Sequence, residues 1–202
     1  MSSALLPVFP LEVVLFPGAP LPLHIFEPRY KEMIGECLER SQLFGVVRAQ
    51  EGGIAQIGCT AEILNVARKY PDGRLDIVTE GRKRFQVVEV NQERSFLQAE
   101  VTYVEDTGET AAPGRTERAL ALHNEMLAIA GAAAISPDQK ADISFRLAAA
   151  LPLDLDVKQA LLVMVSEAER IDALITCYEA LIPSLRKTAD ARRKAGGNGQ
   201  VR

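Results

Sequence analysis

The first 28 residues contain six of the eleven prolines, and this clustering restricts the possible folds more than any other feature of the chain. The prolines alternate with short apolar stretches, such as Val8-Phe9 and Ile25-Phe26. Because proline lacks an amide hydrogen and fixes φ, the segment cannot be a helix, and its apolar stretches must be short strands at edges or corners. We therefore predict that a folded-over sheet begins here.

A single amphipathic helix is predicted directly after Pro28. Apolar residues recur there at helical spacing, with acids and bases on the other face. The apolar positions are Tyr30, Met33, Ile34, Cys37 and Leu38. One face of this helix should pack against the sheet, and the other should face water.

Short β-branched or aromatic stretches between turn residues predict the remaining strands. They cover residues 43–47, 57–67, 75–79, 85–90 and 96–104. The dipeptide Asp72-Gly73 predicts a tight hairpin turn, because both residue types adopt the positive φ angles that such a turn needs. Several short strands with one helix among them favour a closed or nearly closed antiparallel barrel of about a hundred residues.

The chain changes character at residues 106–115, where glycine and proline among small polar residues are typical of a linker. Helices are predicted beyond it over 116–133, from a cap at Ser136-Pro137-Asp138 to Leu151, from a cap at Asp156, and from the capping pair Ser166 and Glu169. The predicted fold class is α+β, with a PUA-like pseudo-β-barrel over 1–108 and a helical bundle over 115–188.

The last predicted helix carries an apolar stripe from Ile171 to Leu185, with a kink expected at Pro183. From Ala189 the chain becomes small, basic and glycine-rich. Such a composition buries too little apolar surface to order itself, so residues 189–202 are predicted to form a disordered basic tail.

Composition excludes several classes of protein. With 48% hydrophobic residues the 202-residue chain can bury a core, and a net charge of −4 is unlike that of a protein that coats nucleic acid. The three cysteines lack metal-binding spacing, so buried reduced thiols are expected. The start of the chain lacks the basic region of a signal peptide, and no segment matches a membrane span, which favours a cytoplasmic protein.

No arrangement of residues indicates catalysis. The two histidines, His24 and His123, have no partner at a spacing suited to zinc; His24 is interpreted as structural and His123 as a solvated surface residue. Ser184 and Lys187 match the S-x-x-K pattern of some hydrolases, but the rest of that signature is missing. Phosphate-binding loops are absent too. We expect no catalytic residue, cofactor or metal.

Two basic clusters, Arg68-Lys69 and Arg82-Lys83-Arg84, lie near strand ends, each beside an aromatic residue. Basic residues on the rim of a β-barrel can bind single-stranded nucleic acid through phosphate contacts and base stacking. The simpler interpretation is strand alternation, which buries Phe85 and leaves its charged neighbours outside.

The order of motifs resembles that of the N-terminal substrate-recognition domain of the Lon family of ATP-dependent proteases. The matching runs are LPVFPL at 6–11, LFPG at 15–18, PLHIFEPRY at 22–30, IGCTAEI at 57–63, DGR at 72–74 and EGRKRF at 80–85. In the second half LPL at 151–153, KQALL at 158–162 and RIDAL at 170–174 are similar to the helical extension of that family. Of these runs, the one at 22–30 is the most specific.

This resemblance implies a PUA-like pseudo-barrel followed by a helical bundle, with a role in contacting other polypeptides. The chain ends before the ATPase and Ser-Lys protease modules of a full Lon protease could begin, so a stand-alone domain without catalysis is expected. Within the matching runs, Glu27, Arg29, Gly81 and Arg84 are expected to set the fold, because fixed corners and buried ion pairs serve architecture first.

The leading hypothesis is a module that binds unfolded or flexible polypeptide segments, with a protease or chaperone as a further partner. An apolar groove on the barrel is expected to bind them, and the candidate residues are Phe16, Pro17, Leu21 and Tyr30. The alternative is an RNA-binding PUA-like domain that uses Arg82, Lys83 and Arg84. A small hydrolase that depends on Ser184 is a remote third hypothesis.

Overall fold

The computed structural model of the protein describes residues 5–134 and 143–197, and it groups the chain into two compact units. Unit 1 contains Met1–Glu105 and Ala148–Val165, whereas unit 2 contains Asp106–Leu147 and Ser166–Arg202. The chain therefore leaves unit 1, returns to it for one short segment and leaves again. This grouping differs from the division into 1–108 and 115–188 that the sequence predicts.

Unit 1 is built from strands that pair in a ring. The strands are β1 (Leu6–Leu11), β2 (Pro20–Ile25), β3 (Phe44–Gln50), β4 (Gly53–Ile54), β5 (Ile57–Lys69), β6 (Leu75–Asn91) and β7 (Leu97–Tyr103). Pairing runs from β1 through β7, β6, β5 and β3, and the β3 pairing with β1 closes the ring. The predicted α+β class is confirmed, although the β1–β3 pair is parallel. The connection through β2 and α1 is long enough for this crossover.

The four prolines of the opening segment that belong to strands lie where the strand has a neighbour on one side. In β1, Pro7 lies in the half that pairs with β7, and Pro10 lies in the half that pairs with β3. Strand β2 pairs with β6 alone, and both of its prolines, Pro20 and Pro22, are exposed. The missing proline amides therefore cost few ladder hydrogen bonds, as expected from the sequence.

Strand β6 is one continuous strand of 17 residues, which corrects the prediction of separate strands at 75–79 and 85–90. The apparent break is Gly81, whose amide donates to Ala19 O at 2.9 Å and whose carbonyl accepts from Gly18 N at 2.8 Å. A Cβ atom at this position would lie 2.1 Å from Phe16 O. The glycine is required because the 16–19 turn lies directly on the strand.

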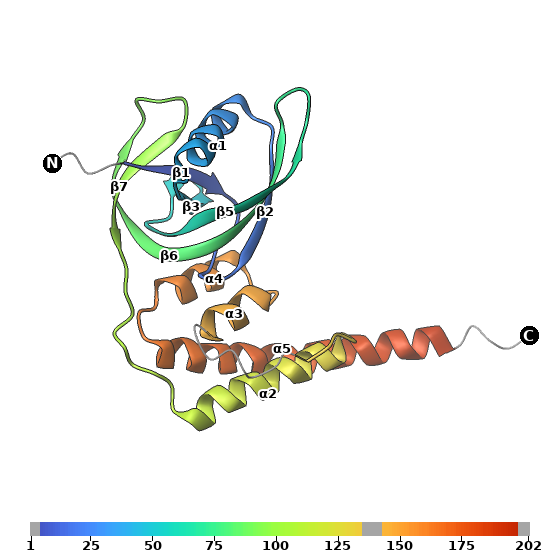
Figure 1. Ribbon diagram of the computed structural model, residues 1–202. Helices are drawn as coiled ribbons and strands as arrows, with labels where there is room; N and C mark the ends of the chain where they lie inside the picture. Colours follow the sequence, from blue (N-terminus) through green and yellow to red (C-terminus); the bar gives the residue numbers. More distant parts are fainter. Residues whose placement is uncertain (1–4, 135–142, 198–202) are drawn as a thin grey trace, which may run out of the picture. The chain divides into compact units, whose positions relative to one another are not determined.

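The predicted helix α1 (Pro28–Arg40) packs against one face of the strands, and Figure 1 shows it next to β1 in the upper part of unit 1. Its buried residues are Tyr30, Met33, Ile34 and Cys37, four of the five predicted from the apolar spacing. They join Phe9, Ile25 and Phe44 in the main core of the unit. The ring of Tyr30 stacks on that of Phe9 with centroids 3.9 Å apart.

The segment that returns to unit 1 carries helix α4 (Leu155–Val163). The side-chain amide of Gln159 donates a hydrogen bond from Nε2 to Ile57 O of β5 at 2.9 Å. Asp156, predicted as the cap of this helix, lies inside its first turn, and the N-cap position is Asp154. The Asp156 carboxylate instead pairs with Arg48 of β3 at 2.6 Å, so a tertiary ion pair replaces the predicted cap.

Unit 2 contains helices α2 (Pro113–Ile129) and α5 (Glu167–Gly197), which run side by side (Figure 1). His123 lies on the α2 face that packs against α5, is 2% exposed, and places Nδ1 2.7 Å from the Tyr178 hydroxyl. The prediction of a solvated His123 is therefore wrong, because its apolar neighbours along the helix bring that face into the core. Burial, and secondarily the charge of Arg146, lowers the pKa of His123.

The ends of the unit 2 helices agree only in part with the sequence. Ser166 Oγ accepts a hydrogen bond from the Glu169 amide at 3.3 Å, which confirms the predicted cap. Helix α3 (Ile143–Ala150) crosses the division between the units, and its predicted cap at 136–138 lies outside the described residues. Helix α5 passes through Pro183 and continues to Gly197, beyond the predicted start of the tail at Ala189; residues 198–202 are not described.

A buried arginine ties the start of unit 2 to its core. Arg170 is 1% exposed and its guanidinium forms a two-pronged ion pair with Asp106, with Nη1 3.0 Å from Oδ1. Its Nε donates to Ser144 Oγ at 2.9 Å, and the guanidinium lies 4.1 Å from the centre of the Phe145 ring. Within the part of the chain that the structure describes, no helix is long and apolar enough to cross a membrane.

Candidate functional site

A mainly apolar groove of about 330 Å³ lies in unit 1, where β1, β2 and the start of α1 come together. Its lining residues are Phe9, Pro10 and Leu11 of β1, Leu23, His24 and Ile25 of β2, and Phe26, Glu27, Arg29 and Tyr30 at the turn into α1. Seven of these ten are aliphatic, aromatic or proline residues, and the two charged ones pair with each other, Arg29 Nη2 lying 2.8 Å from Glu27 Oε2. The groove thus offers apolar contact without a net charge of its own.

Phe26 is the unusual residue of the groove, because it is a large apolar residue that is 58% exposed. It stands between Ile25, which is 1% exposed, and Glu27, the extended residue that precedes α1. Pro28 at the first position of the helix fixes the direction of the chain. The turn therefore places a large apolar ring in solvent beside an apolar hollow, an arrangement that is typical of interaction surfaces.

Two strands line the groove where each has an unpaired side. Among the described residues, the Phe9–Leu11 part of β1 pairs only with β3, and β2 pairs only with β6. An extended segment can add to such an edge, yet Pro10 and Pro22 have no amide to donate. The groove therefore offers mainly apolar side chains and only a few main-chain hydrogen-bonding groups.

His24 is held on the wall of the groove by a hydrogen-bond network. Its Nδ1 lies 2.5 Å from Asp76 Oδ1, and the Tyr70 hydroxyl donates to Asp76 Oδ2 at 2.8 Å. These bonds, with His24 contributing most, lower the pKa of the Asp76 carboxyl, and the bond to Asp76 raises the pKa of Tyr70. The His24 ring lies 5.9 Å from Phe26 and 5.8 Å from Tyr70. This is the structural histidine that the sequence predicts.

The four residues predicted to form the binding surface have different surroundings. Tyr30 lines the groove, where burial raises the pKa of its hydroxyl. Phe16 is 1% exposed and Pro17 is buried, so neither presents a surface, and Leu21 packs half-buried against the core. Sequence reasoning missed Phe26, although its position between a strand end and Pro28 was a signal of an exposed corner.

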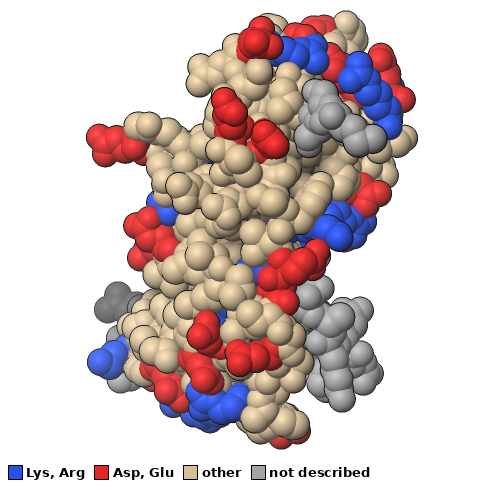
Figure 2. Space-filling model, turned by 90° about the vertical axis from the view of Figure 1, so that its left-hand side faces the viewer, with Lys and Arg blue, Asp and Glu red and all other residues tan. Residues whose placement is uncertain are grey.

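The basic run at 82–84 does not form a common phosphate-binding surface. Arg82 contacts the carboxylates of Glu62 and Glu80, and Arg84 is only 3% exposed. Lys83 Nζ lies 3.8 Å from Glu105 and 5.8 Å from the centre of the Tyr103 ring. On the face seen in Figure 2, acidic and basic side chains are intermixed, without a continuous basic stripe.

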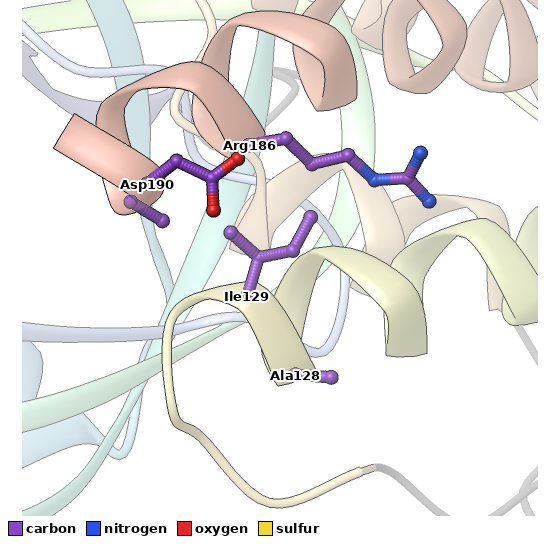
Figure 3. Close-up of a pocket in the computed structure, with 5 residues that line it drawn as sticks. Ala128, Ile129, Arg186 and Asp190 are labelled. Atoms are coloured by element: carbon purple, nitrogen blue, oxygen red, sulfur yellow. The ribbon is translucent and has the colours of Figure 1, made fainter. Parts of the chain in front are cut away.

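A second hollow, of about 550 Å³, lies in unit 2 between the end of α2 and α5. Ile129 points into this space in Figure 3, with Ala128 and Ala189 as the other apolar lining residues. Arg186, at its edge, is paired with Glu125 at 2.8 Å. This hollow lacks the aromatic residues of the unit 1 groove, so it offers a weaker apolar contact.

The residues that the structure describes show no arrangement suited to metal binding or to thiol chemistry. No group of three His, Cys, Asp or Glu side chains lies close enough to hold a metal ion among residues 5–134 and 143–197. Burial raises the pKa of the Cys37 thiol to about 11 and that of Cys59 to about 12, which keeps both in the unreactive thiol form.

Comparison with known proteins identifies the family. Residues 5–177 match the family described as "ATP-dependent protease La (LON) substrate-binding domain". The Lon protease of Parabacteroides distasonis is 33% identical over 122 residues, which are 56% of this chain but only 14% of that protein. Protein cereblon of Xenopus tropicalis is 33% identical over 102 residues, 48% of this chain and 23% of cereblon. The chain therefore spans a small part of these relatives.

Solved structures support the same conclusion. A Lon N-terminal domain protein from Xanthomonas campestris superimposes with a TM-score of 0.71 and 29% identity, covering 86% of this chain and 98% of that one. The N-terminal domain of the Mycobacterium avium complex Lon protease has the same fold, with a TM-score of 0.63, 20% identity and coverage of 87% and 98%. From the motif order, the ring of strands and these matches, the chain belongs to the family of Lon (protease La) substrate-binding domains.

Proposed function

We propose that this protein binds apolar side chains of unfolded or flexible polypeptides in the unit 1 groove and performs no chemical reaction. The single observation that carries the proposal is the exposed ring of Phe26, held by a rigid turn beside the hollow lined by Phe9, Leu11, Leu23 and Tyr30. Membership of a family named for substrate binding supports the same proposal.

The chemistry of the groove favours a polypeptide over a reacting substrate. Its only imidazole, His24, is already bonded to Asp76, and the lining includes no serine, threonine or cysteine nucleophile. Unpaired sides of β1 and β2 flank the hollow, and an extended chain has the shape to lie along them. Apolar side chains of that chain would fill the hollow against Phe26.

The expected affinity is weak. Burial of one large apolar side chain contributes about 1.5–3 kcal/mol. Association costs at least about 4 kcal/mol in lost translational and rotational freedom. Two or more apolar side chains must therefore bind together, and a single segment should bind in the micromolar to millimolar range. Polypeptides with several apolar segments would bind more tightly through effective concentration.

The test is the substitution Phe26→Ala, with binding of a reduced and alkylated unfolded protein measured by fluorescence anisotropy. We expect binding to weaken about fivefold to thirtyfold, as for truncation of a residue central to an interface. The folded stability should stay unchanged because the ring is exposed.

The matched control is Val88→Ala, which removes a 61% exposed apolar side chain of β6 that does not line the groove. Binding should be unchanged in this variant. The proposal is wrong if the wild-type protein does not bind the unfolded protein at high micromolar concentration, or if both variants lose binding equally.

A further inference from the structure

A cluster of cationic side chains surrounds the hairpin between β5 and β6. Arg68, Lys69 and Arg74 lie on this hairpin, and Lys31 of α1 donates to the main-chain carbonyl of Asp72 in its turn at 2.9 Å. We call these four residues the cationic rim. At the tip of this hairpin, residues 66–77, the acidic residues are Asp72 and Asp76, so four cations face two acids in a chain whose net charge is −4.

The cationic rim is continuous with the groove through a series of ring contacts. The guanidinium of Arg68 lies 4.6 Å from the centre of the Tyr70 ring, and that of Arg74 lies 4.8 Å from it. The rings of Tyr70 and His24 are nearly perpendicular with centroids 5.8 Å apart, and His24 lines the groove. A segment seated against Phe26 and His24 would therefore extend toward the rim.

Among the rim cations, Arg68 lies opposite Asp76 in the β5–β6 register, and its charge helps to lower the pKa of that carboxyl. Both oxygens of Asp76 accept hydrogen bonds, from His24 and Tyr70, and Asp72 pairs with Arg74 at 2.7 Å. Arg68 and Lys69 are exposed, and neither forms an ion pair within the part of the chain that the structure describes. Nearer the groove, Arg29 is neutralised by Glu27. Positive charge is thus available at one end of an apolar site.

We propose that the occupant of the groove is an extended polypeptide segment in which acidic residues adjoin the apolar anchor, an inference that rests on the proposed function. The apolar side chains bind against Phe26 and Tyr30, and the acidic residues lie against Arg68 and Lys69. The rim then selects among segments of equal hydrophobicity, since complementary charge adds specificity more than affinity. Segments flanked by basic residues are disfavoured.

The experiment uses three fluorescent peptides with the same apolar centre and with glutamate, glutamine or lysine on the flank. Exposed ion pairs contribute little each, so at low salt the glutamate peptide should bind about threefold to tenfold more tightly than the lysine peptide. The difference should vanish near 1 M salt, where the screening length falls to about 3 Å. The glutamine peptide should bind with intermediate affinity.

Two variants separate this proposal from the proposed function. In Arg68→Gln/Lys69→Gln the three peptides should bind alike, with the affinity of the glutamine peptide unchanged. In Phe26→Ala all three should weaken by the same factor. Arg115→Gln/Arg118→Gln, which removes the same charge from exposed, ion-paired positions of α2, should keep the wild-type preference.

The proposal is overturned if the wild type binds the three peptides equally, or if the preference persists in the Arg68→Gln/Lys69→Gln variant. Loss of all peptide binding in the wild type would instead refute the proposed function itself. Single-stranded RNA is measured in parallel, because cations beside aromatic rings can also bind nucleic acid. RNA binding that the rim variant abolishes, without any peptide preference, would replace the acidic segment with RNA.

Discussion

The guanidinium of Arg84, on β6, donates a hydrogen bond of 2.9 Å to the main-chain carbonyl of Leu162 in α4. A second bond of 2.7 Å goes to the carbonyl of Met164. Carbonyls at the end of a helix have no partner within the helix, and a positive charge there is favourable. A buried arginine thus caps α4 and holds the returning segment in unit 1.

Replacement of Arg84 by methionine should lower the free energy of unfolding by about 1.5–3 kcal/mol, because two buried carbonyls lose a charged donor. Urea denaturation followed by circular dichroism measures this change. The control is Lys83→Met on the same strand. Because the Lys83 side chain is exposed, this substitution should lower the free energy of unfolding by about 0.5 kcal/mol or less. Equal losses in the two variants would show that Arg84 does not serve as a cap.

Substitution of Gly81 by alanine should destabilise the protein by about 1–3 kcal/mol, because the added methyl group overlaps Phe16 O and the 16–19 turn must move. Gly35→Ala in α1 is the matched control, since its Cβ would meet nothing within 4 Å. That variant should gain about 0.5–1 kcal/mol from helix propensity. Thermal denaturation should show a lower Tm for Gly81→Ala and a higher Tm for Gly35→Ala than for the wild type. A Gly81→Ala protein as stable as the wild type contradicts the prediction.

His123 should make the stability of unit 2 depend on pH. Burial lowers the pKa of His123 below its ordinary value of 6.5, so the unfolded chain binds a proton more readily than the folded one. The contribution of the neutral, buried His123 to the free energy of unfolding is therefore fully present above pH 6.5. This contribution is lost as the pH falls from 6.5 through the folded-state pKa. Urea titrations at a series of pH values should show a shallower decline for His123→Gln than for the wild type, and identical slopes would count against burial of a neutral imidazole.

The three thiols should differ in accessibility to a disulfide reagent. Cys37 and Cys59 are at most 1% exposed, whereas Cys177 is only partly buried. Burial raises the pKa of all three thiols, so exposure decides which reacts first. At neutral pH only Cys177 of the native protein should react with a chromogenic disulfide reagent, measured as one equivalent of released coloured thiolate. The substitution Cys177→Ser should abolish this reaction. Reaction of Cys37 or Cys59 without denaturant would refute the packing of the α1 core.

Local patterns predicted much of unit 1. The proline spacing indicated strands with one paired side, and the apolar spacing after Pro28 indicated α1 with four of its buried residues. Both signals are local, because proline fixes its own φ angle and the helical period relates residues only three or four positions apart. The sequence predicts two strands in place of β6, because a glycine within a strand pattern usually indicates a break. In the structure Gly81 instead allows close contact with the 16–19 turn, which is distant in the sequence.

The candidate site was predicted less well for the same reason. Phe16 and Tyr30 are both apolar residues near proline-rich corners, yet Phe16 is buried away from the groove and Tyr30 lines it. Phe26 has the same kind of sequence surroundings and is 58% exposed. A corner position next to proline signals possible exposure, but the exposure itself depends on which elements pack on the residue, and that differs between Phe16 and Phe26.

The amino-acid sequence alone predicts the family, the kinds of element and their order, because proline, glycine and the spacing of apolar residues act on neighbouring residues. Three features follow only from the folded chain: α4 returns to unit 1, His123 is buried, and Phe26, rather than Phe16 or Leu21, projects beside a groove. Each of these depends on contacts between residues distant in the chain, such as Arg84 with Leu162, and such contacts exist only once the whole core has formed.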